Sequence, residues 1–194
     1  MHRLFSLLVA LNLATTPLPA QQVADAVAPE GGGAGAFAVT PATKAALAAK
    51  RAGRPVAAED WMVVAANPLA VEAGADVLRA GGTAADAMVA VQAVLGLVEP
   101  QSSGLGGGAF LVWHDGETGE LTTLDGRETA PLAATPQLFQ DDTGAPLDFY
   151  DAVVGGRSVG VPGTPALLKA AHDRWGRSDW AGLFDPAIRL AETG

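Results

Sequence analysis

The sequence predicts a mixed α/β protein, and three observations carry this prediction. First, 49% of the 194 residues are hydrophobic, which is enough for one ordinary domain with a buried core. Second, alanine-rich segments favour helices, whereas 24 glycines and 13 prolines indicate many turns. Third, two short apolar runs separated by a glycine-containing turn indicate a β-hairpin.

The N-terminus has the pattern of a signal peptide. Met1-His2-Arg3 gives a positive start, and Leu4 to Leu13 form an apolar run that is too short to span a bilayer. Small residues and prolines follow, with a plausible cleavage position after Ala20. We expect residues 1–20 to be a signal peptide, export to the periplasm or the extracellular space, and no stable membrane span. A mistaken start codon or an amphipathic leader is the alternative.

Residues 21–59 are rich in Ala, Gly and Pro and have few branched aliphatic residues to bury. This composition is typical of a linker. Its basic part, from Lys44 to Arg54, fits either a short exposed helix or a solvated linker face. We expect the folded part to cover residues 60–194.

Trp61 to Ala66 form a short apolar run that fits a buried strand. Asn67-Pro68 then has the pattern of an N-cap followed by proline at the first helical position, and Gly81-Gly82 ends that helix. We therefore expect the folded part to begin with a strand, followed by a helix whose two ends are marked.

A second helix follows directly. Thr83 and Asp86 resemble a capping box, and residues 84–98 are apolar on nearly every face until Pro100 ends the helix. A helix of this composition must be buried.

The glycine-rich segment Gly104 to Ala109 contains the spacing of a dinucleotide fingerprint. In a nucleotide-binding unit such glycines follow a strand and open a helix, but here they follow a helix and enter a strand. No Gly-Lys-Ser/Thr sequence indicates a P-loop either, so we expect no cofactor. The glycines are interpreted as structural, allowing a close turn; the alternative is that their N–H groups help to line a substrate pocket.

The predicted hairpin pairs residues 110–113 with residues 121–125 through a turn at residues 115–119. Arg127 follows the second strand. An arginine suits carboxylate recognition, because its guanidinium is always charged and can donate two parallel hydrogen bonds. A salt bridge from Arg127 to Asp125 or Glu128 is the alternative, and local sequence alone favours it.

The C-terminal third predicts two further helices. Thr164-Pro165 is expected to cap a helix that runs to Trp175 and is closed by Gly176, and Asp185-Pro186 begins another. His172, followed by Asp173, is expected on a helix surface, the alternative being an acid-base pair. Asp141-Asp142 is expected in a solvated turn, the alternative being a catalytic carboxylate pair.

Composition excludes several classes of function. The formal net charge of -9 argues against nucleic acid as a partner, because phosphate binding needs clustered lysine and arginine. The chain has no cysteine, which removes disulfides, thiolate metal sites and cysteine nucleophiles. The three histidines are dispersed, and no pair has the spacing of metal ligands, so we expect no metal site.

Several motifs, in matching order and spacing from about Trp61 to Gly194, resemble those of gamma-glutamyltransferases. The motifs are Ala66-Asn67-Pro68-Leu69-Ala70, Gly81-Gly82-Thr83-Ala84-Ala85-Asp86-Ala87, Glu99-Pro100-Gln101-Ser102-Ser103-Gly104-Leu105-Gly106-Gly107-Gly108, Asp125-Gly126-Arg127-Glu128-Thr129-Ala130-Pro131, Val159-Gly160-Val161-Pro162-Gly163-Thr164 and Asp185-Pro186-Ala187-Ile188-Arg189-Leu190-Ala191.

The resemblance implies an α+β fold of the N-terminal nucleophile hydrolase type, an αββα sandwich that is incomplete in this chain. It implies a precursor that cleaves itself into a large and a small subunit, the new N-terminal threonine of the small subunit being the nucleophile. That threonine attacks the γ-glutamyl amide of glutathione or a related compound, and water, an amino acid or a peptide then accepts the γ-glutamyl group. Arg127 maps onto the arginine that holds the α-carboxylate.

In the resembling family, the nucleophilic threonine and the oxyanion hole lie far downstream of residue 194. We therefore expect a truncated chain that is inactive alone, with no catalytic residue of its own and the small subunit as its partner. Two other functions stay open. A related acylase for glutaryl-type β-lactam side chains shares the scaffold, and a non-catalytic carboxylate-binding relic would be favoured if the native gene ends at Gly194.

Overall fold

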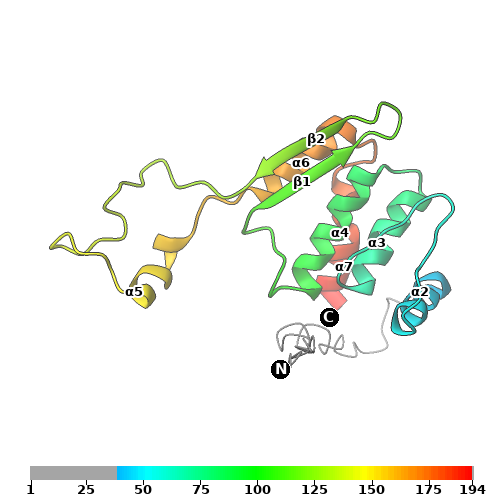
Figure 1. Cartoon of the computed structure of the whole chain (residues 1–194), viewed down its shortest axis with the longest axis horizontal. Coiled ribbons are helices and arrows are strands. Elements are labelled where there is room, and N and C mark those ends of the chain that lie inside the picture. The colour runs from blue at the N-terminus through cyan, green and yellow to red at the C-terminus, as the bar shows by residue number, and fades with distance from the viewer. Residues whose placement is uncertain (1–38, 194) are drawn as a thin grey trace, which may run out of the picture. The chain divides into compact units, whose positions relative to one another are not determined.

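The computed structural model describes residues 39–193, so the expected signal peptide and the first part of the expected linker lie outside the described residues. Helices dominate this part of the chain, and its one β-hairpin lies against α6 (Figure 1). The elements are α2 (Pro41–Arg51), α3 (Pro68–Arg79), α4 (Ala84–Val98), β1 (Ala109–His114), β2 (Leu121–Gly126), α5 (Phe149–Val153), η1 (Gly156–Ser158), α6 (Thr164–Trp175), η2 (Ala181–Phe184) and α7 (Asp185–Thr193).

Helix α2 lies within the range expected as a linker, so the basic segment is helical from Lys44 to Arg51, and Arg54 lies beyond the helix. Thr40 is the N-cap, and its side chain accepts a hydrogen bond from the Thr43 backbone N–H. The backbone N–H and the hydroxyl of Thr40 both donate to Glu72 Oε1 on α3, at 2.8 and 2.7 Å. Two hydrogen bonds therefore link the start of α2 to α3.

Helices α3 and α4 begin where their caps predict. Asn67 Oδ1 accepts from the Leu69 N–H at 2.9 Å, and Gly81 ends the α3 segment with φ 90°. Thr83 and Asp86 form a complete capping box on α4. The two helices pack against each other through small residues, which lets their backbones approach closely. The buried residues of this cluster are Ala70, Ala73, Ala90 and Val94.

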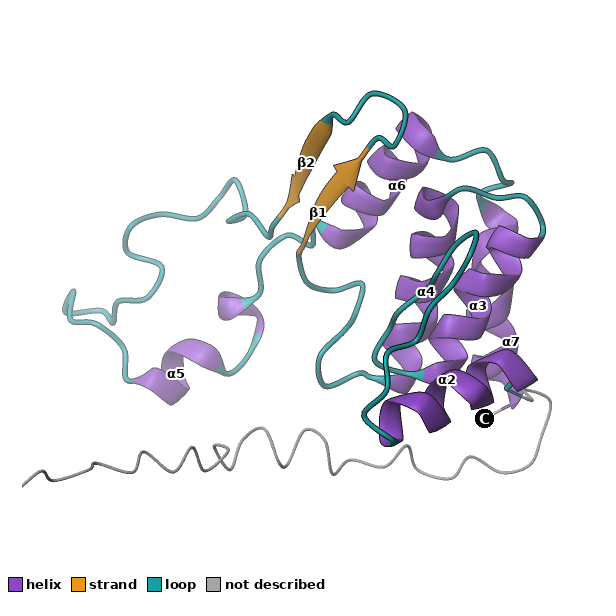
Figure 2. Ribbon diagram, turned by 45° about the vertical axis from the view of Figure 1, so that its right-hand side comes forward, coloured by secondary structure: helices purple, strands orange, loops and turns teal. Residues whose placement is uncertain are grey.

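Strands β1 and β2 pair antiparallel, with Ala109 opposite Gly126 and His114 opposite Leu121, which confirms the predicted hairpin. Asp115 Oδ1 accepts from two backbone N–H groups in the turn, and Gly119 adopts φ 75°. One face of the hairpin packs on α6 (Figure 2), with Leu111 buried, whereas Phe110 on the other face is 66% exposed.

The second core lies between the hairpin, α4 and α6. Its buried residues are Val89, Leu111, Leu167, Leu168, Ala171 and Leu183. The rings of Trp113 and Trp175 stack with centroids 4.5 Å apart, so β1 packs against the C-terminal end of α6. Helix α6 is thus the element that joins the hairpin to the helical layer.

The expected buried strand at residues 61–66 is wrong. These residues form a loop in which Val64 is 82% exposed and Trp61 is 43% exposed. An apolar run becomes a strand only where a neighbouring strand can accept its hydrogen bonds, and the described sheet consists of β1 and β2 alone.

Residues 127–163 connect the hairpin to α6 and contain α5 and η1. Asp141 lies in a turn there, with Oδ1 accepting from the backbone N–H groups of Thr143 and Ala145, so the predicted solvated turn is confirmed. Over residues 39–193, no helix is both long and apolar enough to cross a membrane.

Candidate functional site

Arg127 is the first residue after β2, and Asp125 fixes how the backbone leaves the strand. Asp125 Oδ1 accepts a hydrogen bond from the Arg127 backbone N–H at 2.9 Å, forming a local turn. The Arg127 side chain is exposed, and within residues 39–193 its guanidinium makes no ion pair. The alternative of a salt bridge to Asp125 or Glu128 is therefore not found, and Asp125 bonds the Arg127 backbone instead.

The carbonyl oxygen of Gly107 connects the glycine-rich loop to α6, and we call this hydrogen-bonded group the Gly107 node. It accepts three hydrogen bonds: from the backbone N–H groups of Gly163 and Thr164, each at 3.1 Å, and from the Thr164 hydroxyl at 3.0 Å. The glycine-rich loop before β1 is thus bonded to the first turn of α6. The two segments are 57 residues apart in the sequence.

The prediction that Thr164 caps α6 is wrong. The N-cap is Gly163, and Thr164 is the first residue of the helix, with 1% of its surface exposed. Its hydroxyl donates away from the helix, to Gly107, instead of accepting from a helix N–H. The physical reason is that the fold brings the Gly107 carbonyl, 57 residues away in the sequence, within hydrogen-bond reach of this hydroxyl, which local sequence does not reveal.

Two glycines press their backbones against the Arg127 segment. A Cβ on Gly108 would lie 2.9 Å from Arg127 Cα, and a Cβ on Gly163 would lie 2.0 Å from the Gly126 carbonyl oxygen. Only glycine allows such approach. Within the glycine-rich loop the structural interpretation is supported at Gly108 alone, because a Cβ on Gly104 or Gly106 would meet nothing within 4 Å.

A short bridge closes the other side of the Arg127 segment. The backbone groups of Thr129 and Val161 exchange two hydrogen bonds, at 3.3 and 2.8 Å. Arg127 is therefore flanked by the Asp125 turn before it and by the Thr129–Val161 bridge after it. Its backbone is positioned while its guanidinium is left exposed.

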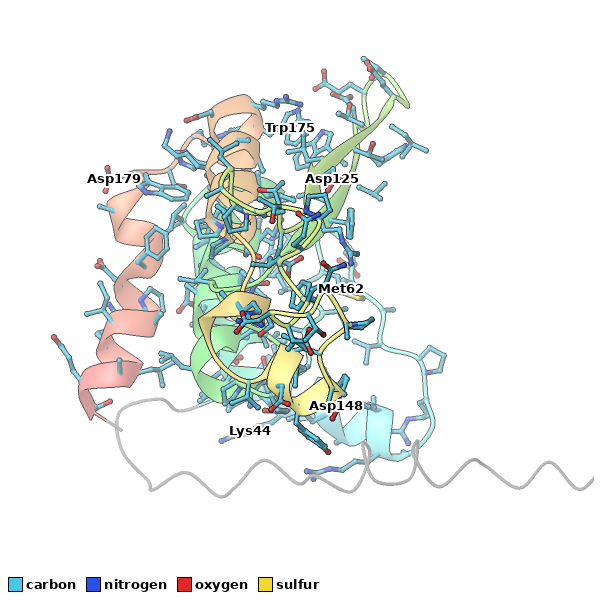
Figure 3. All side chains as sticks on the ribbon, turned by 90° about the vertical axis from the view of Figure 1, so that its left-hand side faces the viewer. Lys44, Met62, Asp125, Asp148, Trp175 and Asp179 are labelled. Atoms are coloured by element: carbon cyan, nitrogen blue, oxygen red, sulfur yellow. The ribbon has the colours of Figure 1, made fainter. Side chains whose placement is uncertain are left out.

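A half-open cavity of about 450 Å³ lies between the end of β2 and α6. Its walls are mostly apolar, and its charged residues are two arginines and one aspartate. The lining residues are Leu124, Asp125, Gly126, Arg127, Thr129, Val161, Pro162, Gly163, Ala166, Leu167, Ala170 and Arg174. Figure 3 labels Asp125 on the hairpin and Trp175 on α6. None of residues 104–108 lines this cavity, so the alternative role of their N–H groups has no support here.

At the other end of α6, the buried carboxylate of Asp86 on α4 forms a second hydrogen-bonded group, which we call the Asp86 node. It is 0% exposed and accepts from the backbone N–H of Thr83 at 2.8 Å, from that of Arg177 at 3.1 Å, and from the backbone N–H and hydroxyl of Ser178 at 3.2 and 3.0 Å. Burial by itself raises the pKa of Asp86, but the hydrogen bonds from these residues outweigh it and hold that pKa below its ordinary value.

His172 belongs to the same node, so its predicted place on a helix surface is wrong. Its side chain is 15% exposed, with Nε2 2.9 Å from the Ser178 carbonyl oxygen and 3.5 Å from Asp86 Oδ1. The turn after α6 folds back over the imidazole, which local sequence cannot show. The Ser178 hydroxyl bonds Asp86 and not His172, so these three side chains do not form a relay that activates the serine. In the described part of the chain, no group of side chains could hold a metal ion.

The sequence family described as Gamma-glutamyltranspeptidase matches residues 70–194. The Glutathione hydrolase proenzyme of Bacillus subtilis (strain 168) is 48% identical over 136 residues, which are 70% of this chain and 23% of that protein. This chain spans about a quarter of the length of the curated relatives it matches.

Solved structures give the same relationship. The gamma-glutamyltranspeptidase of Helicobacter pylori aligns with a TM-score of 0.67 and 40% identity, covering 72% of this chain and 40% of that one. A cephalosporin acylase from Bacillus halodurans aligns with a TM-score of 0.53 and 36% identity, covering 65% of this chain and 23% of that one. The fold class predicted from the sequence, α+β and partial, is confirmed.

Proposed function

This chain belongs to the gamma-glutamyltranspeptidase family, and we propose that it forms the N-terminal part of the large subunit of a γ-glutamyltransferase or glutathione hydrolase. The complete enzyme cleaves the γ-glutamyl amide of glutathione and related compounds. A nucleophile attacks the γ-carbonyl carbon, the amine leaves, and a γ-glutamyl-enzyme forms. Water then releases glutamate, or an amino acid or peptide takes the γ-glutamyl group.

The observation that carries this proposal is the placement of Arg127. Its backbone is held by the Asp125 turn and the Gly108 contact, while its guanidinium is exposed at a cavity with no carboxylate partner among the described residues. A substrate α-carboxylate can accept two parallel hydrogen bonds there. In a chain of net charge -9, a local cation is also needed to offset the repulsion of an anionic substrate.

The remaining parts of the enzyme follow from the family. We assign the nucleophilic threonine to a small subunit cut from the same precursor, in keeping with the word proenzyme in the relatives' names. That subunit is the partner of this chain. The N-terminal pattern supports export to the periplasm or extracellular space through a signal peptide at residues 1–20.

A second function, β-lactam side-chain acylase activity, is supported by the structural match to the cephalosporin acylase. A glutaryl group has a terminal carboxylate that Arg127 could hold equally well, but it lacks the α-amino group of a γ-glutamyl donor. Activity on γ-glutamyl-p-nitroanilide and on a glutaryl cephalosporin therefore distinguishes the two functions.

The test uses the complete gene product, purified after self-cleavage. Arg127→Ala should raise the KM for γ-glutamyl-p-nitroanilide on the order of 10- to 100-fold, because charge-assisted hydrogen bonds are lost, and should leave self-cleavage intact. Arg127→Lys should recover part of the loss, since it restores the charge without the paired geometry. An unchanged KM in Arg127→Ala would refute the role of Arg127, and no activity on either substrate in the wild type would favour the non-catalytic relic.

A further inference from the structure

The Thr164 side chain is a buried polar group in direct contact with the arginine-presenting region. It is 1% exposed, and its hydroxyl donates to the Gly107 carbonyl at 3.0 Å. The residue contributes no atom to the cavity that Arg127 lines. Any effect of Thr164 on ligand binding must therefore be transmitted through the backbone.

Two backbone contacts connect the Gly107–Thr164 hydrogen bonds to Arg127. The residue after the bonded carbonyl, Gly108, has its Cα against Arg127, since a Cβ there would lie 2.9 Å from Arg127 Cα. The residue before Thr164, Gly163, has its Cα against the Gly126 and Arg127 carbonyl oxygens, which a Cβ would meet at 2.0 and 2.7 Å. Both glycines are next to the residues that form the Gly107–Thr164 hydrogen bonds. A shift of the Gly107 carbonyl therefore moves both of the glycines that contact the backbone of Gly126 and Arg127.

We infer that Thr164 is a positioning residue for Arg127: its hydroxyl holds the Gly107 carbonyl so that Gly108 and Gly163 grip the backbone of Arg127 and orient its guanidinium toward the substrate carboxylate. The inference rests on the proposed function, because it takes Arg127 to bind that carboxylate. The hydroxyl is the one donor to the Gly107 carbonyl that a side-chain substitution can remove. Two backbone N–H groups still bond the same carbonyl when the hydroxyl is removed, so the fold is retained.

The experiment uses the complete, self-cleaved enzyme and γ-glutamyl-p-nitroanilide. Thr164→Val keeps the branched shape and removes the hydroxyl, and it should raise KM about fivefold, the scale of one lost hydrogen bond, with kcat changed by less than about twofold. Thr164→Ser keeps a hydroxyl and should restore most of the affinity. The matched control is Thr193→Val, which removes a hydroxyl bonded to the Arg189 carbonyl at 2.8 Å within α7 and should leave KM unchanged.

A double-mutant cycle separates positioning from general loosening of the fold. In an Arg127→Ala background, Thr164→Val should have almost no further effect on KM, because the group it positions is gone. A fivefold increase in KM that is fully retained in that background would overturn the inference, and so would a Thr164→Val enzyme with wild-type KM.

The failure of the inference and the failure of the proposed function give different results. If Arg127→Ala raises KM but Thr164→Val does not, the positioning role is wrong and the carboxylate site stands. If Arg127→Ala leaves KM unchanged, both are wrong.

Discussion

The two ends of α6 are held in opposite ways. At its N-terminal end, a neutral backbone carbonyl of Gly107 accepts three hydrogen bonds, and the nearby charged group, Arg127, is exposed and forms no ion pair within the described residues. At its C-terminal end, the charged group itself, Asp86, is fully buried and bonded by Thr83, Arg177 and Ser178. A buried charge that is fully hydrogen-bonded supports the fold, whereas an exposed charge on a fixed backbone is available to a ligand.

This contrast assigns different consequences to mutations at the two ends. Changes at the C-terminal node should act on stability and should alter substrate affinity little. Changes at the N-terminal node should act on affinity, except where they collide with the backbone itself.

The largest effect is expected from Gly163→Ala. Gly163 has φ −100°, which alanine adopts freely, so the penalty comes from collision: a Cβ would lie 2.0 Å from the Gly126 carbonyl oxygen. The Cβ is fixed to the backbone of α6 and the contacted oxygen belongs to the backbone of β2, so no side-chain rotation can relieve the collision and α6 must move away from β2. We expect a loss of at least about 3 kcal/mol in the free energy of unfolding, or failure to fold.

Thermal unfolding of the complete protein measures this, with Gly116→Ala as the matched control, because a Cβ on Gly116 would meet nothing within 4 Å. An alanine variant at residue 163 with a wild-type Tm would show that the contact between α6 and the hairpin can open freely. The division between the two ends would then lose its geometric basis.

The next largest effect is expected from Asp86→Asn. The amide keeps one acceptor oxygen but places an N–H₂ group against backbone donors of Arg177 and Ser178, so charge-assisted hydrogen bonds are lost in a buried place. We expect a loss of about 2–3 kcal/mol in the free energy of unfolding, with KM for a γ-glutamyl substrate near that of the wild type. The control is Asp76→Asn, whose carboxylate is 69% exposed and should change stability by less than about 0.5 kcal/mol.

The pH dependence of the Asp86→Asn difference checks its cause. Hydrogen bonds hold the pKa of Asp86 below its ordinary value despite the opposing effect of burial. A lowered pKa in the folded state stabilises the protein fully above the unfolded value, about 3.9, and this contribution is lost as pH falls through the folded pKa. The Tm difference between wild type and variant should therefore stay constant from neutral pH to about pH 5 and shrink below about pH 4. A difference that persists unchanged in acid would indicate a steric cause.

The sequence predicted those features that depend on neighbours within a few residues. The Asn67 cap, the Thr83–Asp86 capping box and the Asp115 turn each join groups at most three residues apart, and all three form. Local pattern is sufficient there because the hydrogen-bond partners are fixed by helix or turn geometry.

The features that the sequence did not predict depend on distant partners. Thr164 bonds a carbonyl 57 residues away, and Asp86 bonds backbone groups 91 and 92 residues away. His172 is covered by a turn whose position only the folded chain determines. The apolar run at residues 61–66 lacks a described neighbouring strand. For Arg127, local sequence favoured a salt bridge to Asp125 or Glu128, and only the geometry showed that Asp125 bonds the backbone instead.

The smallest effect is expected at Asp125, and it sharpens the contrast between the two carboxylates. Asp125 Oδ1 accepts from the Arg127 N–H, a task that needs an oxygen and not a charge. Asp125→Asn keeps that oxygen and removes a negative charge from the cavity wall, so KM for an anionic γ-glutamyl substrate should fall by less than about threefold at low ionic strength and return toward the wild-type value in salt. Asp125→Ala removes the turn and should raise KM.

Steady-state kinetics of the three proteins at two ionic strengths give the answer. If Asp125→Asn raises KM as much as Asp125→Ala does, the charge itself contributes to binding, and the most direct reason would be an ion pair with the substrate ammonium group. The exposed carboxylate would then join Arg127 as a ligand group, in place of the purely structural role that the Asp125–Arg127 backbone bond supports. If only the alanine variant loses affinity, the two carboxylates differ as described: Asp86 acts through its charge, and Asp125 acts through the position of its oxygen.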